Sequence, residues 1–185
     1  MLTHDHHGLR RLLDRFTAWE HRLALRFNRP NSRRLWSAFF GGVSRLGDGL
    51  FWYLLMAGLL LFDGTAALKP VLVMILTGVA CTLTYRWIKQ TTTRQRPCQR
   101  YPGIRLTTLP LDLYSFPSGH TLHAVAFTVV ASVYYPVLTP WLAAFALLVA
   151  ASRLILGLHY LSDVLVGALI GGTIALTGLY LASLS

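Results

Sequence analysis

Five long apolar stretches follow one another from residue 50 onward, and they constrain the fold more than any other feature of the sequence. The stretches cover residues 50–62 with their flanks, 70–88, 121–138, 141–156 and 164–184. A hydrocarbon core about 30 Å thick takes about 20 helical residues to cross. Lipid cannot hydrogen-bond the backbone, and no alternating strand pattern competes, so these stretches are predicted to be helices. We therefore predict an all-α fold, a multi-pass transmembrane helical bundle with about five spans.

The composition excludes a soluble globular protein. Hydrophobic residues make up 54% of the 185 residues and charged residues only 13%, and the mean hydropathy is +0.51. The formal net charge of +10 could indicate binding to nucleic acid. We expect no nucleic-acid partner, because the basic residues flank the apolar stretches, where Lys and Arg anchor the topology or bind anionic lipid head groups. The oligomeric state stays open.

The first part of the chain is rich in arginine. Between residues 9 and 29, arginines alternate with Leu, Phe and Trp, so that a helix would carry one basic and one apolar face. This pattern is typical of a helix that lies in the membrane interface. We predict an Arg-rich N-terminal interfacial helix over residues 1–34 and a membrane-embedded domain over residues 35–185.

A short amphipathic segment precedes the first span. It covers residues 34–46 and is interrupted at Gly47-Asp48-Gly49. Its roughly 12 residues would rise only about 18 Å as a helix, too little to cross the hydrocarbon core. Five crossings then place the N-terminus, the polar loop 89–117 and the segment 157–163 on one side of the membrane, with the C-terminus opposite.

Three polar islands interrupt the apolar stretches on that same side, and the first runs from Lys89 to Pro97. Lys89 and Arg96 are seven residues apart, so on a helix they would share a face. Pro97 disfavours helical geometry at Arg96, so the guanidinium can turn back toward Lys89. The alternative is a plain basic anchor at the end of a span.

The second island is Phe116-Pro-Ser-Gly-His120, directly before the third apolar stretch. The backbone N–H groups of Ser118 and Gly119, at the N-terminus of a helix, would form an anion site, and His120 beside them can give a proton. The simpler interpretation is a turn and a helix cap. The two interpretations are compatible, and local sequence alone does not separate them.

The third island runs from Ser152 to Asp163 and sets Arg153, His159 and Asp163 between two apolar stretches. Each such group at mid-bilayer costs roughly 2.5–3.5 kcal/mol, so three together indicate a function. His159 and Asp163 are one helical turn apart, so Asp163 can accept a hydrogen bond from one imidazole nitrogen and leave the other as an oriented nucleophile. Arg153 and His159 lie about 240° apart around a straight helix, which predicts a bend at Gly157. A purely structural Arg–Asp pair would leave the histidine unexplained.

Together the islands hold the groups that phosphoryl transfer requires. The cations are Lys89, Arg96 and Arg153. They suit a transition state whose charge spreads over three equatorial oxygens. We predict that His159, oriented by Asp163, attacks phosphorus and that His120 protonates the departing oxygen. No cluster of carboxylates offers a Mg²⁺ site, so we expect no metal ion and no cofactor.

These residues resemble the three-part signature of the type-2 phosphatidic acid phosphatase superfamily, which includes membrane lipid phosphatases and vanadium haloperoxidases. The signature reads K-x6-R-P, P-S-G-H and S-R-x5-H-x3-D. The chain matches it with Lys89 to Arg96-Pro97, with Pro117 to His120, and with Ser152-Arg153 to His159 and Asp163. The resemblance implies a helical-bundle core, a phosphohistidine on His159 and an acid at His120. It also implies a phosphate site of Lys89, Arg96, Ser118, Gly119 and Arg153.

The resemblance leads us to expect an integral membrane lipid phosphatase whose substrate is a lipid phosphate or diphosphate. Candidates are phosphatidic acid, phosphatidylglycerol phosphate and undecaprenyl diphosphate, each with its tail in the bilayer. One alternative is a lipid phosphotransferase that uses the same site, and another is a non-catalytic lipid-binding membrane protein. Many bacterial members have six spans, and here the Arg-rich helix replaces the first.

The side of the membrane on which the site lies is predicted differently by two arguments. Resemblance to bacterial lipid phosphatases implies the inner (plasma) membrane, with the site on the periplasmic face. The positive-inside rule implies the cytoplasmic face, because the arginines between residues 10 and 34 lie on the same side as the site. We adopt the periplasmic face, since catalytic arginines inflate the count of basic residues.

Three smaller expectations concern the surroundings of the islands. The loop arginines Arg94, Arg100 and Arg105 could contact lipid head groups, and we expect a solvated basic loop instead. His123 could line the pocket, and we expect it to pack between helices. Gly167 and Gly171 form a small-xxx-small pair, which we assign to packing within the bundle.

Overall fold

The computed structural model describes residues 5–110 and 112–184, and every regular element in those two ranges is helical. The α-helices are α1 (Asp5–Asn28), α2 (Arg34–Arg45), α3 (Phe51–Asp63), α4 (Leu68–Thr92), α5 (Pro97–Arg100), α6 (Gly119–Tyr134), α7 (Thr139–Ile155) and α8 (Leu161–Ser183). Short helical turns join several of them: η1 (Arg29–Ser32), η2 (Leu46–Leu50), η3 (Gly64–Ala67) and η4 (Pro136–Leu138). The all-α prediction is confirmed.

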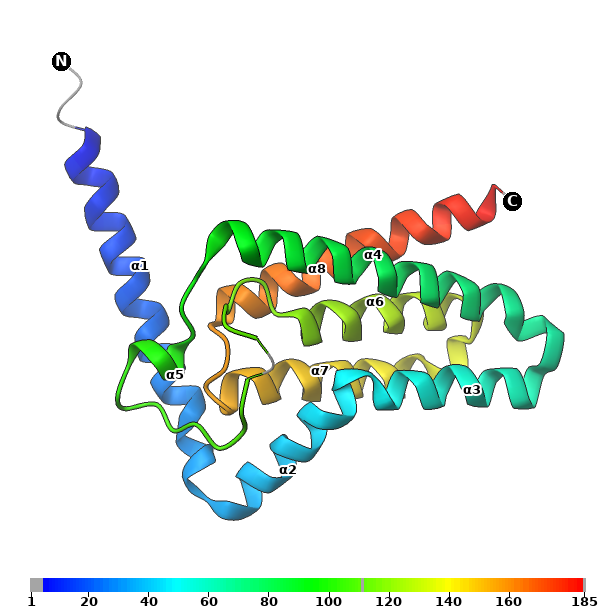
Figure 1. Ribbon diagram of the computed structural model, residues 1–185, viewed down its shortest axis with the longest axis horizontal. Coiled ribbons are helices and arrows are strands. Elements are labelled where there is room, and N and C mark those ends of the chain that lie inside the picture. Colours follow the sequence, from blue (N-terminus) through cyan, green and yellow to red (C-terminus); the bar gives the residue numbers. More distant parts are fainter. Residues whose placement is uncertain (1–4, 111, 185) are drawn as a thin grey trace.

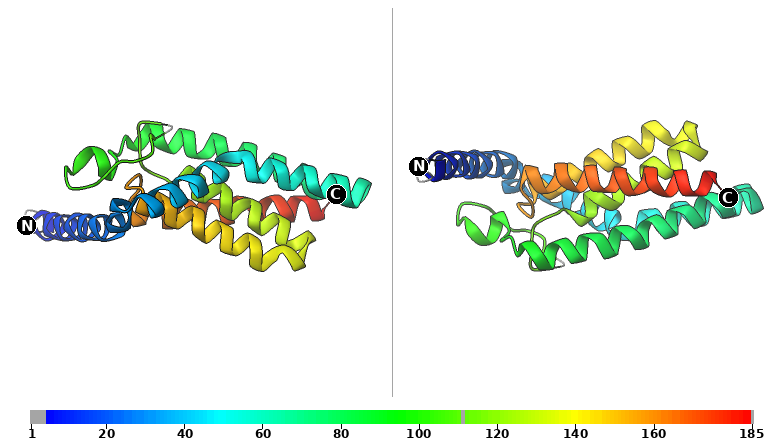
Figure 2. Two further views of the ribbon diagram at one scale, coloured as in Figure 1. Left: turned by 90° about the horizontal axis from the view of Figure 1, so that it is seen from below. Right: turned by 90° about the horizontal axis from the view of Figure 1, so that it is seen from above.

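Helices α3, α4, α6, α7 and α8 run lengthwise through one bundle (Figures 1 and 2). Three stretches in the described ranges are long and apolar enough to cross a membrane, namely Arg34–Arg100, which includes α2 to α4, Pro136–Ile155 and Leu161–Ser183. Large apolar side chains stand on the outside of the bundle, as Phe62 at 95% and Trp141 at 76% exposure illustrate. Such a surface is stable against lipid tails and not against water. The chain is a membrane protein.

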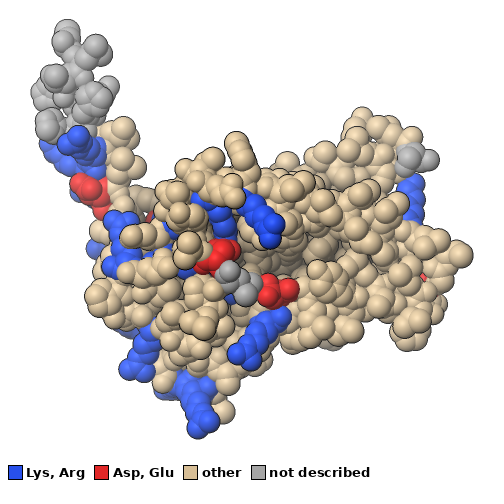
Figure 3. Space-filling model, in the orientation of Figure 1, with Lys and Arg blue, Asp and Glu red and all other residues tan. Residues whose placement is uncertain are grey.

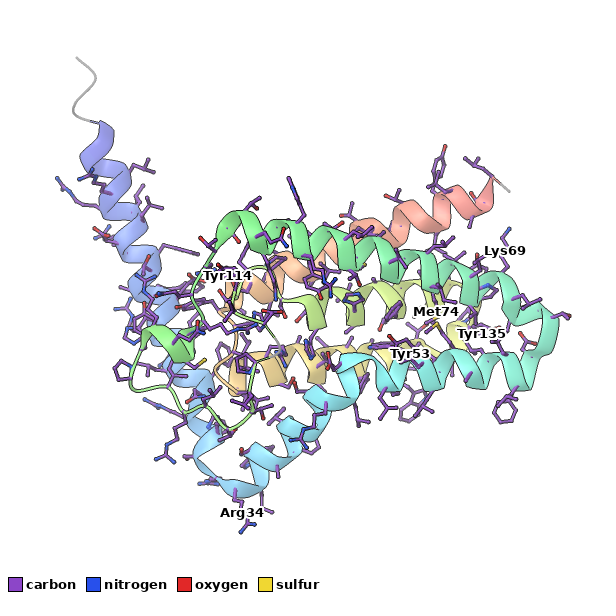
Figure 4. The ribbon with its side chains drawn as sticks, in the orientation of Figure 1. Arg34, Tyr53, Lys69, Met74, Tyr114 and Tyr135 are labelled. Atoms are coloured by element: carbon purple, nitrogen blue, oxygen red, sulfur yellow. The ribbon has the colours of Figure 1, made fainter. Side chains whose placement is uncertain are left out.

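The two ends of the bundle differ in charge. Helix α1, the polar loop before α6 and the turn before α8 lie at one end, and α8 carries the C-terminus to the other (Figure 1). Lys and Arg atoms gather at the first end, while the length of the bundle is mostly free of charge on the face shown (Figure 3). Arg34 and Tyr114 lie at this end, and Lys69 and Tyr135 lie at the opposite end (Figure 4). The predicted arrangement of the polar islands on one side is therefore observed.

Two glycines let α8 approach α6 closely. A Cβ atom on Gly171 would lie 2.1 Å from the carbonyl oxygen of Leu122, and one on Gly167 would lie 2.7 Å from that of Ser118. Any larger residue would push the two helices apart. The prediction that this pair packs inside the bundle is confirmed, and the contact holds the start of α6 against the start of α8.

The predicted break at residues 47–49 is also confirmed. Asp48 and Gly49 leave helical geometry, and Gly49 has a φ of +121°. A Cβ on Gly47 would lie 2.7 Å from a methyl group of Val149 in α7. The break therefore lets α2 lie against α7 before the chain turns into α3.

Helix α1 has a docked half and a projecting half. The side-chain amide of Asn28 donates to the carbonyl oxygens of Arg105 at 3.0 Å and Ile155 at 2.8 Å, and Ala24 is buried. From Leu9 to Phe16 the large apolar side chains are exposed, and this half stands away from the bundle (Figure 1). Its exposed apolar face fits the predicted interfacial helix, and the division between residues 34 and 35 stays a prediction.

Candidate active site

A cavity of about 960 Å³ opens at the charged end of the bundle, between α3, α4 and α6. Six of the eight residues predicted for the site line it: Lys89, Arg96, Gly119, His120, Arg153 and His159. In Figure 3, basic and acidic atoms border the hollow between α4 and α3 on the side of the charged end. Residues that are up to 70 positions apart in the chain thus line one cavity.

Lys89 and Arg96 converge in the way the sequence predicts. Helix α4 ends at Thr92, the next residue adopts a left-handed conformation, and Arg96 is extended before Pro97. Lys89 Nζ and Arg96 Nη2 then contact the two carboxylate oxygens of Asp112, each at 2.6 Å. Burial alone would raise the pKa of the Asp112 carboxyl, but its bonds to the two cations outweigh this effect and lower that pKa.

Asp112 was not identified from the sequence. It lies in the polar loop at no fixed spacing from the signature residues, so no local pattern marks it. Its carboxylate holds together the two cations expected to bind phosphate, and it therefore stands at a position where an anion is stable.

Arg153 and His159 reach the same cavity because the chain bends between them. Gly157 has a φ of +72°, and a Cβ there would lie 2.4 Å from Ile104. The predicted glycine bend is thus confirmed. Arg153, at the end of α7, is buried and donates a hydrogen bond to the hydroxyl of Ser44 in α2.

His159 is 2% exposed and lies between a cation and a carboxylate. Its Nε2 is 3.1 Å from Arg96 Nη1, and because a guanidinium only donates, the lone pair is on Nε2 and the proton on Nδ1. Burial, together with the charges of the nearby arginines and Lys89, lowers the pKa of His159 well below 6.5. The ring is therefore neutral at neutral pH, with its lone pair directed toward Arg96.

The contact between His159 and Asp163 differs from the prediction. His159 precedes α8, which begins at Leu161, so the two residues do not share a helical turn. The distance from Nδ1 to Asp163 Oδ2 is 3.6 Å, and Nδ1 has no hydrogen-bond partner within the described residues. Asp163 Oδ2 instead accepts the backbone N–H of Tyr160 at 2.8 Å. Asp163 faces the imidazole but also caps its own helix.

The second island divides into a structural and a cavity-facing part. Ser118 donates its backbone N–H to the carbonyl oxygen of Asp163 at 3.0 Å, and its hydroxyl caps α6 through Thr121. The expectation of two free N–H groups is therefore wrong for Ser118, which does not line the cavity. Gly119 and His120 do line it, and His120 Nε2 lies 3.4 Å from Asp48 Oδ1.

The expectation of a solvated loop is wrong for Arg94: its Nη1 donates to Asp163 Oδ1 at 2.6 Å, and its Nη2 donates to Glu20 Oε2 at 2.5 Å. His123 packs between α6 and α4, as expected, with its ring 3.1 Å from the hydroxyl of Thr82, and it also lines the cavity. One sequence signal could have pointed to Glu20, since it is the one glutamate among the 7 acidic residues of the chain.

The protein is thus of the class of all-helical membrane bundles with a charged cavity at one end. This cavity holds the three predicted cations and the two predicted histidines. Within that class, the chain belongs to the PAP2 superfamily, whose family model matches residues 66–184. The matched region includes α4 to α8 and every predicted site residue.

Two of the solved structures that resemble the chain come from bacteria. The transmembrane PAP2 type phosphatidylglycerolphosphate phosphatase from Bacillus subtilis is 22% identical with a TM-score of 0.72, and the match covers 91% of this chain and 86% of that one. LpxE from Aquifex aeolicus is 28% identical with a TM-score of 0.65, and the match covers 83% of this chain and 92% of that one. Both matches support the same helical fold.

Proposed function

We propose that this protein is a lipid phosphatase that hydrolyses a lipid phosphate or diphosphate through a phosphohistidine on His159. The observation that carries the proposal is the convergence of Lys89, Arg96, Arg153 and two histidines on one cavity. A phosphoryl group in this cavity would have cations around its equatorial oxygens. His159 and His120 would serve as nucleophile and acid.

In the first half-reaction, the Nε2 lone pair of His159 attacks phosphorus while the bond from phosphorus to the lipid oxygen breaks. His120 takes up a proton when the phosphate dianion enters the cavity, because the dianion and the Asp48 carboxylate 3.4 Å from its Nε2 together offset the surrounding cations. It then gives this proton to that oxygen. Arg96 turns from Nε2 to the phosphoryl oxygens. Asp163, facing the Nδ1–H, stabilises the positive charge that develops on the phosphorylated ring.

In the second half-reaction, water replaces the lipid alcohol. His120, now neutral, takes a proton from the water, and the oxygen attacks phosphorus. The bond from phosphorus to Nε2 breaks, its electron pair returns to His159, and inorganic phosphate leaves. Because three side chains supply positive charge, we expect activity to persist in excess EDTA.

The shape of the cavity supports a substrate with an apolar tail. Below the charged groups its walls are apolar side chains of α3, α4 and α6: Trp52, Met56, Ile75, Val79, Leu83 and Phe127. A head group can thus bind at the polar end while its tail extends toward the lipid. The Bacillus subtilis neighbour is a phosphatidylglycerolphosphate phosphatase. We propose this lipid, phosphatidic acid and undecaprenyl diphosphate as the substrates to compare.

Two alternatives use the same pocket. A phosphotransferase would pass the phosphoryl group from His159 to a second lipid alcohol, and it would form a phospholipid in place of free phosphate when that alcohol is supplied. A silent lipid-binding protein would bind lipid phosphate without forming a covalent intermediate. The nucleophile, the acid and the three cations that line the cavity argue against the non-catalytic protein.

The variant His159→Ala tests the proposal. Purified protein in detergent is given short-chain phosphatidic acid, and we expect the variant to lose phosphate release and the acid-labile phosphoenzyme. His120→Ala is expected to form the phosphoenzyme only from a phosphate ester with an acidic leaving group, which needs no proton. Equal phosphate release with and without His159 would refute the mechanism.

We also propose that the site faces the periplasm of a bacterial inner membrane. The C-terminus lies at the opposite end of the bundle and would then be cytoplasmic (Figure 1). A C-terminal reporter fusion tests this orientation. Activity of a reporter that works only outside the cell would overturn it and favour the positive-inside argument.

A further inference from the structure

We infer that Glu20 of the N-terminal helix is a positioning residue for His159, and that it acts through Arg94 and Asp163. This makes part of α1 belong to the catalytic unit. The inference rests on the proposed phosphohistidine chemistry of His159. It starts from a chain of contacts that joins α1, the loop after α4 and the start of α8.

Arg94 binds two carboxylates at once. Its Nη1 contacts Asp163 Oδ1 at 2.6 Å and Ser162 Oγ at 2.8 Å, and its Nη2 contacts Glu20 Oε2 at 2.5 Å. Ser162 Oγ donates in turn to Glu20 Oε1 at 2.5 Å, which closes the network. The guanidinium also lies 4.2 Å from the ring centre of Tyr160. Arg94 therefore has one defined orientation.

Burial distinguishes this network from an ordinary surface ion pair. Glu20 is 3% exposed and Asp163 is fully buried, whereas the side chain of Arg94 is 27% exposed. An arginine on a loop with access to solvent has many conformations in the absence of a second partner. Glu20 is the partner that holds Arg94 against the buried Asp163.

The network also sets how Asp163 faces the histidine. Arg94 occupies Oδ1, so Oδ2 is the oxygen that lies 3.6 Å from His159 Nδ1. Arg94 pairs with both Glu20 and Asp163, so its positive charge is divided between two carboxylates. Asp163 therefore keeps more of its negative charge than it would if Arg94 paired with Asp163 alone. A more negative Asp163 favours the Nδ1–H tautomer and stabilises the charged ring during phosphoryl transfer.

The place of Glu20 on α1 connects this effect to the rest of that helix. The docked half includes Glu20, the buried Ala24 and Asn28, and His21 stacks on Tyr101 at 3.7 Å between ring centres. The arginine-rich half before Glu20 is exposed. Any displacement of α1 from the bundle would thus break the contact of Glu20 with Arg94.

Glu20→Gln tests the inference, with Asp14→Asn as the matched control. Both changes remove one carboxylate from α1, and Asp14 is exposed. We expect Glu20→Gln to lower kcat about 10- to 100-fold, by analogy with the loss of a hydrogen-bond partner behind a metal-binding histidine, with KM changed less than about threefold. The control should retain wild-type kcat. Arg94→Lys keeps the positive charge but loses the planar guanidinium that binds two carboxylates at once, so its kcat should lie between those of Glu20→Gln and the wild type.

A second measurement does not depend on turnover. Nitrogen NMR of ¹⁵N-histidine-labelled protein, with His159→Asn for assignment, reports the tautomer of His159. We expect Nδ1–H in the wild type and in Asp14→Asn, and a reduced Nδ1–H population in Glu20→Gln. An unchanged tautomer together with an unchanged kcat in Glu20→Gln would overturn the inference. Absence of phosphatase activity in every protein with the tautomer shift present would instead refute the proposed function alone.

Discussion

Charged side chains are buried at one end of the helical bundle and exposed at the other. At the far end, Asp63 accepts a hydrogen bond from Tyr135 at 2.7 Å, and both groups are exposed, as is Lys69. At the site end, Lys89, Arg153 and Asp163 are buried. Charged groups are stable at a membrane surface without special partners, whereas buried ones need hydrogen bonds and opposite charges. The difference indicates that burial of charge at one end serves chemistry.

A second cavity lies between α4 and α8 toward the far end of the bundle. It has a volume of about 570 Å³ and is lined by apolar residues, threonines, Gly178 and Lys69. Its lining includes neither a histidine nor a carboxylate. Both ends of the bundle therefore have a cavity. Only the cavity at the site end is lined by the histidines and the cluster of cations that phosphoryl transfer needs.

The largest effect is expected from Arg153→Ala compared with Lys69→Ala. Removal of a preorganised donor to a developing anion costs about 10²- to 10³-fold in rate. We expect this loss in kcat/KM for phosphate release from short-chain phosphatidic acid when Arg153 is truncated. Lys69→Ala should retain the wild-type value, and equal losses in the two variants would contradict the functional difference between the ends.

The next effect concerns the bend that joins Arg153 to His159. In Gly157→Ala, a Cβ would meet Ile104 at 2.4 Å and Asn28 at 3.0 Å with φ at +72°. A Cβ in left-handed geometry costs about 1–2 kcal/mol and overpacking about 1–3 kcal/mol. We expect a lower Tm in detergent and reduced phosphate release. Gly58→Ala, where nothing lies within 4 Å, should leave both unchanged or raise the Tm slightly.

A smaller effect is expected where a carboxylate occupies the anion site. Substrate phosphate must replace Asp112 as the partner of Lys89 and Arg96. We expect Asp112→Asn to bind inorganic phosphate several-fold more tightly, measured as product inhibition, because the competing charge is gone. Asp63→Asn at the far end is the matched control. Weaker inhibition in Asp112→Asn would show that Asp112 organises the two cations more than it competes with substrate.

The smallest effect is a pH dependence of stability. The pKa of His159 is lowered in the folded protein, so below about pH 6.5 the unfolded chain binds more protons at this site. Its contribution to stability is fully present above pH 6.5 and is lost as the pH falls. We expect the Tm to drop more between about pH 7.5 and pH 5.5 in the wild type than in His159→Asn. Parallel curves would mean that His159 titrates at its ordinary pKa.

The sequence predicts the long helices well and their contacts poorly. Apolar length and breaking residues are local signals, so the expected spans agree with α3, α4, α6, α7 and α8 to within a few residues, and Gly157 is correctly placed as a bend. The partners of the site residues are not local. Arg153 pairs with Ser44, 109 positions away, and Arg94 pairs with Glu20, 74 positions away. No spacing pattern reports contacts over such separations.

The sequence alone indicates that this chain forms apolar helices suited to a membrane, and that it carries the PAP2 signature at the ends of those helices and on the segments between them. Contacts between distant segments of the folded chain set the partners of those residues. It assigned the N–H of Ser118 to Asp163, placed Asp112 between two cations, and brought Glu20 to Arg94. Periodicity and spacing follow from the local backbone, whereas the choice of partner for a buried charge depends on which distant segments pack beside it.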